Sequence, residues 1–381
     1  MKTMKVALLA TAALAAFSVS ARADDAAAIK AQLEALTARI AQLEAAPAVP
    51  VGFSLLTISE GAPMDWSDLT TDHVLNKKSH VISILPTADA PAASEIAWDI
   101  EIRAAIRYED HEAEVEDDVN FNTRARVRVV AKTETAVGEV GVRVRIQGVF
   151  ADTSTYSTTA DVDMNIAWGW WQMTPEWQFG GGFAGSLSDP GHGMDALMYY
   201  GDTIFLGAGD EEQFRLTYAS GPLTWGVALE DNDDADMGLA VSSRIDWAGD
   251  AVSFSLAGFF RPEDNDDDAY QLAAGATFNV SDMLTLSING AIGEEHSFAP
   301  DEGFWAVTGY AGLHLSDTAW VEVGAGIAEY DLSVNDNILV SAAFWWQPAD
   351  QLTMGIQGSH RNFDTSGLDE TELAFVTFFT Y

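Results

Sequence analysis

The chain has 381 residues, of which 48% are hydrophobic and none is cysteine, and its formal net charge is −39. Nucleic-acid-binding proteins need a basic surface, which so acidic a chain lacks. A chain without cysteine contains neither a disulfide framework nor a thiolate metal site. Composition therefore excludes nucleic acid as a partner and excludes a disulfide-rich scaffold.

Residues 1–23 have the organisation of a secretory signal peptide. Lys2 and Lys5 precede an apolar run over 6–19, and Ala21-Arg22-Ala23 supplies a small-residue cleavage site. No later segment reaches the roughly 18 apolar residues of a transmembrane helix. If the mature chain enters a membrane, it must do so as a closed β-barrel.

Residues 24–46 have a clear helical pattern. The apolar positions are spaced alternately by four and three residues, which is an a/d seam formed by Ile29, Leu33, Leu36, Ile40 and Leu43. We favour a short parallel coiled coil over a single amphipathic helix lying on lipid or on the rest of the protein. Residues 47–95 are a linker of unknown structure, in which 81–85 has the composition of a strand.

From Ile96 to Tyr381, apolar and polar side chains alternate with a period of two, in sixteen segments. Short connections such as 173–176 alternate with longer ones such as 185–212, which is the layout of an outer-membrane barrel. Tryptophans gather near the segment ends and predict an interfacial girdle, among them Trp168, Trp171, Trp247, Trp320, Trp345 and Trp346. We therefore predict an all-β fold over 96–381, a 16-stranded antiparallel transmembrane β-barrel, rather than a soluble β-sandwich.

Arginines line one face of two consecutive predicted strands within 122–147. Arg124, Arg126 and Arg128 occupy alternate positions, as do Arg143 and Arg145, and alternate residues of a strand share a face. In a soluble sheet this would be an ordinary solvated surface. In a barrel it places a dense row of positive charge inside.

Sequence motifs of enzymes and cofactor sites are not convincing. Gly180-x-Gly182-x-x-Gly185 matches a dinucleotide fingerprint, but no βαβ unit surrounds it, so the glycines more simply relieve crowding. The acidic runs 231–233 and 264–268 resemble calcium-loop starts without the glutamate at the twelfth position. No HExxH or G-x-S-x-G motif occurs. We expect no enzyme activity and no cofactor, with at most weak divalent-cation binding at acidic outer loops.

The stretch Arg124-x-Arg126, Thr133-Glu-Thr135-x-x-Gly138 and Arg143-x-Arg145-x-Gln147 resembles the trimeric general-diffusion porins of alphaproteobacterial type, which are Gram-negative outer-membrane proteins. The resemblance covers 96–381, and the chain departs from that family in the stretch before Ile96. It implies that the third outer loop, 185–212, folds into the barrel and narrows it.

The resemblance further implies that acidic residues of this loop face a basic wall across the pore. The acidic side would comprise Asp189, Asp195 and Asp202. The basic wall would comprise Arg103, Arg107, Arg124, Arg126, Arg128, Arg143 and Arg145. An alternative is that these arginines compensate buried carboxylates such as Asp99, Glu101, Asp161 and Asp163. Both interpretations can hold at once.

We therefore expect an outer-membrane porin, a water-filled channel for passive diffusion of ions and small hydrophilic solutes. The alternatives are a substrate-selective channel and a structural envelope tether anchored by the barrel. The expected partners are two further copies in a homotrimer, outer-membrane lipid and lipopolysaccharide. The N-terminal segment would lie in the periplasm, where its helix is a candidate for cell-wall contact.

Overall fold

The computed structural model describes residues 56–61, 79–84, 94–111, 118–153, 157–192, 209–231, 239–262, 268–296, 299–331, 337–363 and 369–381. They belong to one compact unit. The predicted signal peptide (1–23) and coiled-coil segment (24–46) lie outside the described residues. Within the ranges given above, no helix is long and apolar enough to cross a membrane.

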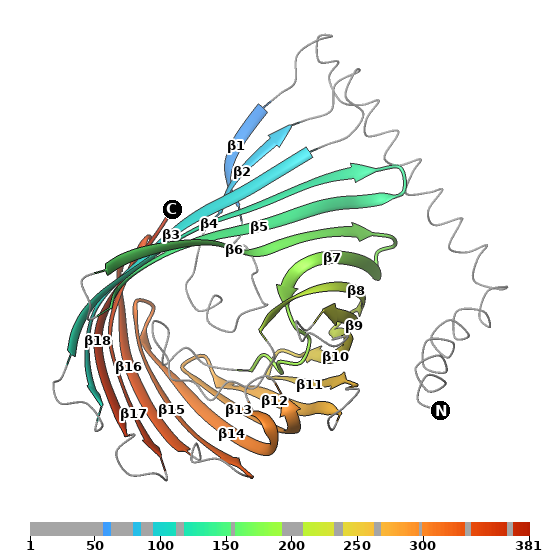
Figure 1. Ribbon diagram of the computed structural model, residues 1–381. Coiled ribbons are helices and arrows are strands. Elements are labelled where there is room, and N and C mark those ends of the chain that lie inside the picture. Colours follow the sequence, from blue (N-terminus) through green and yellow to red (C-terminus); the bar gives the residue numbers. More distant parts are fainter. Residues whose placement is uncertain are drawn as a thin grey trace. The chain divides into compact units, whose positions relative to one another are not determined.

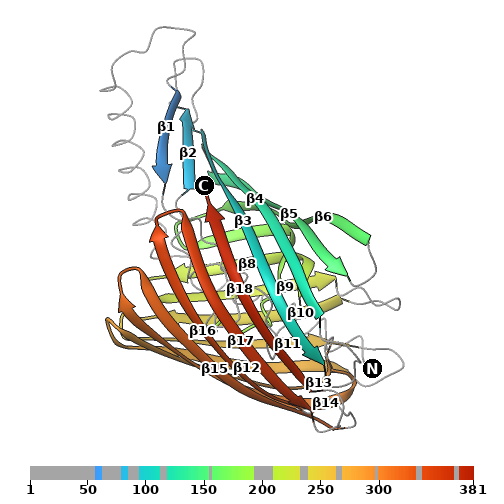
Figure 2. The same ribbon diagram turned by 90° about the vertical axis from the view of Figure 1, so that its left-hand side faces the viewer.

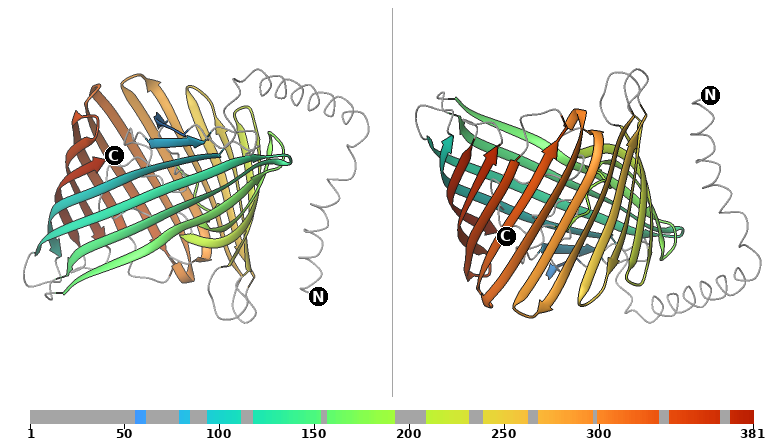
Figure 3. Two further views of the ribbon diagram at one scale, coloured as in Figure 1. Left: turned by 90° about the horizontal axis from the view of Figure 1, so that it is seen from above. Right: turned by 90° about the horizontal axis from the view of Figure 1, so that it is seen from below.

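Sixteen strands, β3 to β18, form a closed antiparallel barrel (Figure 1). Each strand pairs with the next along the chain, and β18 returns to pair with β3 (Figure 3). The sixteen-stranded all-β prediction is confirmed. The strands are β3 Ser94–His111, β4 Asp118–Thr135, β5 Gly138–Thr153, β6 Ser157–Gln172, β7 Trp177–Gly185, β8 Asp210–Ser220, β9 Leu223–Asp231, β10 Leu239–Ala248, β11 Val252–Arg261, β12 Ala269–Ser281, β13 Leu284–His296, β14 Ala299–Ser316, β15 Ala319–Tyr330, β16 Asn337–Ala349, β17 Leu352–Phe363 and β18 Glu370–Thr380.

Two further strands precede the barrel, β1 (Leu56–Gly61) and β2 (Ser79–Ile84). They pair with each other, and β2 also pairs with the first residues of β3. Both lie within the stretch that the sequence leaves as a linker, 47–95. The strand composition noted at 81–85 falls on β2.

The two faces of the barrel wall differ because side chains alternate along each strand. In β3, Ile102 and Ile106 point outward and are 42% and 45% exposed, whereas Glu101 and Arg103 point inward and are 0% and 1% exposed. The other strands repeat this pattern with Val, Ile, Leu and Phe outside. An apolar outer face and a polar inner face suit a barrel surrounded by lipid.

Short turns join the strands at one end of the barrel, as predicted. Two residues each connect β4 to β5, β8 to β9, β12 to β13, β14 to β15 and β16 to β17. The first of these turns ends at Gly138, whose φ of 116° is favoured only for glycine. The opposite end carries mostly longer connections, of which 186–209 between β7 and β8 is the longest, although only two residues separate β13 from β14 there.

Candidate functional site

The arginines of β4 lie opposite charged residues of β3. Directly opposite residues of antiparallel strands share a face, so both sets point into the barrel. The opposite pairs are Arg124 with Arg103, Arg126 with Glu101, and Arg128 with Asp99.

Glu101 is the hub of an ion-pair lattice on this inner wall. Its carboxylate lies 2.5 Å from Arg103 Nε, 3.3 Å from Arg124 Nη2 and 3.9 Å from Arg128 Nη2. Arg128 Nε also donates to Asp99 Oδ1 at 2.5 Å. The arginines thus compensate the buried carboxylates Asp99 and Glu101, as the alternative interpretation proposes, whereas Asp163, which it also names, is exposed.

The remaining arginines extend this wall along β3 and β5. Arg126 Nε donates to Gln147 Oε1 at 2.5 Å, and Arg145 Nε donates to Asn165 Oδ1 at 2.8 Å. Arg107 forms an ion pair with Glu109, and Arg143 lies opposite Val130 on the same inner face. All seven predicted basic residues therefore share the inner face of β3 to β5. Their role in a constriction stays a prediction.

These arginines differ sharply in their access to water. The side chains of Arg103, Arg128 and Arg145 are 1%, 0% and 0% exposed. Arg124 and Arg107 are 18% and 17% exposed. The lattice therefore has a buried layer and an outer layer, and the outer layer is closer to any solute in the barrel.

The chain turns inward after β7. Residues 186–192 lie against the inner faces of β9 to β13 and are held by side chains of those strands. The bonds include Ser186 Oγ to Glu230 Oε2 at 2.8 Å, Gln271 Nε2 to the Ser188 carbonyl at 2.9 Å, and Arg244 Nη1 to the Asp189 carbonyl at 3.2 Å. Ser255 and Asn289 donate to the carbonyls of Pro190 and His192.

Glu230 anchors the start of this inward segment. Its buried carboxylate accepts hydrogen bonds from the Ser186 hydroxyl, the Leu187 N–H at 3.3 Å and the Ser242 hydroxyl. Gly226 leaves room for the segment, because a Cβ there would lie 2.9 Å from Leu187 Cδ1. A glycine at this position of β9 thus allows the Leu187 side chain to pack directly against the wall.

The last residues of the inward segment carry two titratable groups. Burial raises the pKa of the Asp189 carboxyl, although the N–H of Gly191 (2.7 Å) and the charge of Arg244 act in the opposite direction. Burial lowers the pKa of His192, whose Nδ1 lies 2.9 Å from Thr277 Oγ1. The two other predicted loop aspartates, Asp195 and Asp202, lie outside the described residues.

The inward segment and the arginine lattice occupy opposite sides of the barrel. The lattice lies on β3 to β5 and the segment on β9 to β13, about half-way round a ring of sixteen strands. A negatively charged loop at this position would therefore face the arginines across the interior.

An aromatic cluster on the inner wall was missed from the sequence. Trp320, Trp345 and Phe378 are 7%, 0% and 0% exposed, and both indole N–H groups donate to Glu322 at 3.2 and 2.9 Å. The predicted interfacial girdle is thus wrong for Trp320 and Trp345. It is also wrong for Trp168, which is 6% exposed and lies over Gly180.

The outward tryptophans do match the girdle prediction, since Trp171, Trp247 and Trp346 are 38%, 41% and 48% exposed. A signal in the sequence separates the two groups. Trp345 and Trp346 are adjacent, so in a strand only one of them can face outward.

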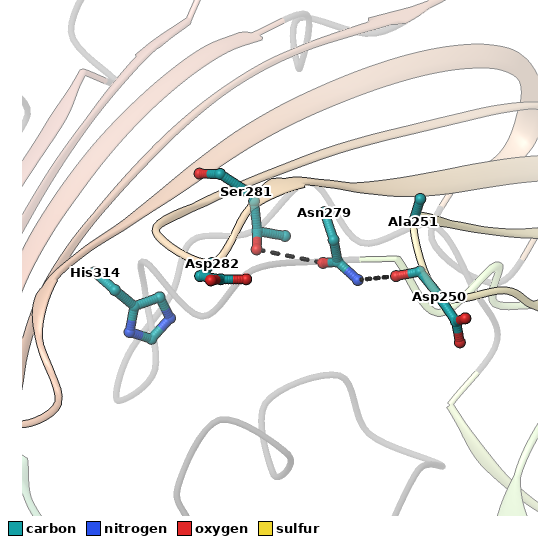
Figure 4. A pocket seen from close by; sticks show the side chains of 7 residues that line it. Asp250, Ala251, Asn279, Ser281, Asp282 and His314 are labelled. Carbon is teal, nitrogen blue, oxygen red and sulfur yellow. Dashed lines mark hydrogen bonds between the residues drawn. The ribbon is translucent and has the colours of Figure 1, made fainter.

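A polar pocket of about 460 Å³ lies beside the short turns (Figure 4). Asp250 and Asp282 come from turns, whereas Asn279, Thr285 and His314 come from β12, β13 and β14. Asn279 Nδ2 donates to the Asp250 carbonyl at 3.1 Å. Across the described ranges, no group of three or more acidic or histidine side chains could hold a metal ion.

Comparison with solved structures identifies the fold. A mutant of the Rh. blastica porin matches with a TM-score of 0.53 and 17% identity, covering 75% of this chain and 100% of that one. Salmonella typhi OmpF, in a complex with daunomycin, matches with a TM-score of 0.57 and 12% identity, covering 75% and 98%. The chain has a porin fold.

A loop-deletion mutant of OmpT, an outer membrane protein of Vibrio cholerae, also matches, with a TM-score of 0.58, 11% identity and coverage of 76% and 99%. No protein-family model matches the sequence. No curated protein is significantly similar to it. The porin fold is therefore recognised through strand topology and hardly through residue identity.

Proposed function

We propose that the protein is an outer-membrane general-diffusion channel for ions and small hydrophilic solutes. The observation that supports this best is a closed ring of sixteen strands with an apolar outer face and a polar, charged inner face. Side chains alone do not fill a barrel of that strand number, so a water-filled path remains. The outer face suits lipid, and the porin fold suits the outer membrane of a Gram-negative bacterium.

We further propose that the inward loop and the arginine lattice form the constriction. Asp189, with Asp195 and Asp202 further along the loop, would supply the negative side, and the seven arginines would supply the positive side. Opposed rows of fixed charge order the water between them, so an apolar solute must disrupt that order whereas a small polar solute need not. Charged rings also set ion preference.

The test is a reversal-potential measurement across a salt gradient in a planar bilayer. Arg→Gln at Arg124, Arg126 and Arg128 should make the pore more cation-selective, and Asp→Asn at the three loop aspartates should make it less so. Lys132→Gln is the matched control, because Lys132 lies on the same strand but pairs with Glu139 near the turn at 3.5 Å. Both effects should shrink as salt rises.

Shifts of the same sign from both triple variants, or no shift from the arginine variant, would contradict the proposed constriction. A protein that inserts but carries no current at all would contradict the channel itself. The two failures are thus distinguishable.

The substrate-selective alternative would need an aromatic path along the interior. Trp320, Trp345 and Phe378 face inward, but they are almost fully buried and offer no such exposed track. Their burial favours a general-diffusion channel.

We also propose that three copies associate, with the a/d seam of residues 24–46 bundling three helices and with lipopolysaccharide around the barrels. Replacing Leu33, Leu36 and Ile40 with Asp should lower trimer stability or weaken attachment to the cell wall while the pores stay open. A monomeric mass for the purified wild type would refute the trimer.

A further inference from the structure

β3 pairs along one edge with two strands that are far apart in the sequence. β18 lies opposite Glu101 to His111, and β2 lies opposite Ser94 to Trp98. β4 lies along the other edge over nearly the whole strand. β2 and β18 therefore lie end to end on the same edge of β3, and β2 continues the line of the last strand (Figure 2).

The junction between β18 and β2 is nearly continuous. Tyr381, the last residue printed in the sequence, donates its N–H to the Ile100 carbonyl at 2.9 Å and accepts the Ile100 N–H at 2.8 Å. His80 of β2 lies opposite Trp98, so only Asp99 separates the two pairings along β3. The side chain of Asp99 turns to the other face, where it pairs with Arg128.

Three rings cover this junction on the outer face. The His80 ring stacks on Trp98 with centroids 4.8 Å apart and on Tyr381 with centroids 4.6 Å apart, at interplanar angles of 21° and 20°. Trp98 and Tyr381 lie 6.0 Å apart. A side chain from β2 thus contacts both strands of the closing seam.

We propose that the β1–β2 hairpin is a clamp that keeps the barrel closed by holding the end of β18 against β3. The end of a strand frays unless it is tied down. β2 ties it by extending the ladder past Tyr381 and by stacking His80 on its ring. β1 pairs with all six residues of β2. This second partner stabilises β2, since a strand this short is only marginally stable with one partner.

The first test removes the ring contact from the full mature protein in detergent. His80→Ala should lower the temperature at which the compact form, seen on gels of unboiled samples, converts to the unfolded form. His360→Ala is the control, because this exposed histidine contacts β18 through Thr371 near the strand's other end. Equal shifts for the two variants, or no shift for His80→Ala, would overturn the clamp.

The second test locks the hairpin instead of weakening it. Val81 and Ala97 lie opposite each other, and the chain has no cysteine, so Val81→Cys with Ala97→Cys allows only the engineered disulfide. Oxidation should raise the transition temperature above that of the reduced sample. Val81→Cys with Ala105→Cys is the control, since Ala105 lies opposite Val376 of β18 and should not bond.

A disulfide that fails to form between 81 and 97 would show that β2 does not lie on β3. A disulfide that forms without raising the transition temperature would show that the hairpin does not hold the seam. Both measurements are independent of whether the barrel conducts.

Discussion

The buried layer of the arginine lattice should maintain the barrel, whereas its outer layer should tune ion preference. The side chains of Arg128 and Asp99 are almost fully buried, and Arg128 Nε lies 2.5 Å from Asp99 Oδ1. Removing one partner of a buried ion pair costs about 3–5 kcal/mol. Arg124 is 18% exposed, and its partner Glu101 also contacts Arg103 and Arg128. Its removal should cost about 1 kcal/mol or less.

The expected changes in ion preference follow from the charge of the lattice. Around Glu101, three arginines (103, 124 and 128) oppose two carboxylates (99 and 101), and Arg126 and Arg143 beside them add further positive charge. Arg124→Gln removes one of these positive charges. A unit charge acts on an ion 4 Å away with about 1 kcal/mol in water, which corresponds to a roughly fivefold change in the local concentration of that ion at low salt, upward for cations and downward for anions.

The assay pairs the thermal transition on gels of unboiled samples with the reversal potential in a salt gradient. Arg124→Gln should lower the transition temperature less than Arg128→Gln does and shift selectivity towards cations. Arg128→Gln should lower the transition temperature by several degrees. The double variant with Asp99→Asn should regain part of that loss, because replacing both partners leaves no buried charge unpaired.

Equal transition temperatures for Arg124→Gln and Arg128→Gln would refute the division into two layers. A double variant no more stable than Arg128→Gln alone would refute the coupling between Arg128 and Asp99. An unmoved reversal potential for Arg124→Gln would remove this residue from the permeation path.

Three further outcomes are expected from the inner wall. Glu230→Gln weakens the anchor of the inward segment, so single-channel recordings should show larger current fluctuations at an unchanged barrel stability. His192 should make the inward segment pH-sensitive, because burial lowers the pKa of its imidazole from 6.5. When the segment leaves the wall, His192 regains its ordinary pKa and binds a proton more readily. Acidification below pH 6.5 should therefore favour detachment of the segment. Open-channel noise measured down to about pH 5 should rise in the wild type but not in His192→Gln. Gly355→Ala should destabilise the barrel by about 1–3 kcal/mol and so lower the transition temperature, because its Cβ would collide with the Trp345 ring. Gly258→Ala should not, because the nearest atom to its Cβ lies at 3.8 Å.

Much of the barrel follows from sequence because the period of a strand assigns each residue to a face. The alternate arginines at 124, 126 and 128 had to share a side, and the continuing pattern placed that side inside. Compensation of buried carboxylates was one of the two interpretations that the sequence allowed. Which arginine pairs with which carboxylate could not be predicted, because Asp99 lying opposite Arg128 is a tertiary pairing. The loop aspartates beyond His192 stay a prediction.

The β1–β2 hairpin could not be predicted from the sequence, for a different reason. Each strand has six residues, too few for a reliable period, and the linker between β2 and β3 hides their adjacency. The inward tryptophans were missed because the prediction assigned tryptophans to the girdle by residue type and did not consider which face of the strand each one occupies. Trp345 is buried whereas the adjacent Trp346 is exposed, so the place of a tryptophan in the strand decides which face it occupies.

The partners of β3 also imply an order of events during folding. β2 and β4 are its neighbours in sequence, whereas the Thr377 hydroxyl of β18 bonds the Ala104 carbonyl across 273 positions. Contacts of such long range form late, because a long loop must close first. Until then, β3 presents unpaired backbone groups over 101–111, where another chain can pair with them. Misassembly should therefore concentrate on that stretch, while 94–98 is already covered by β2.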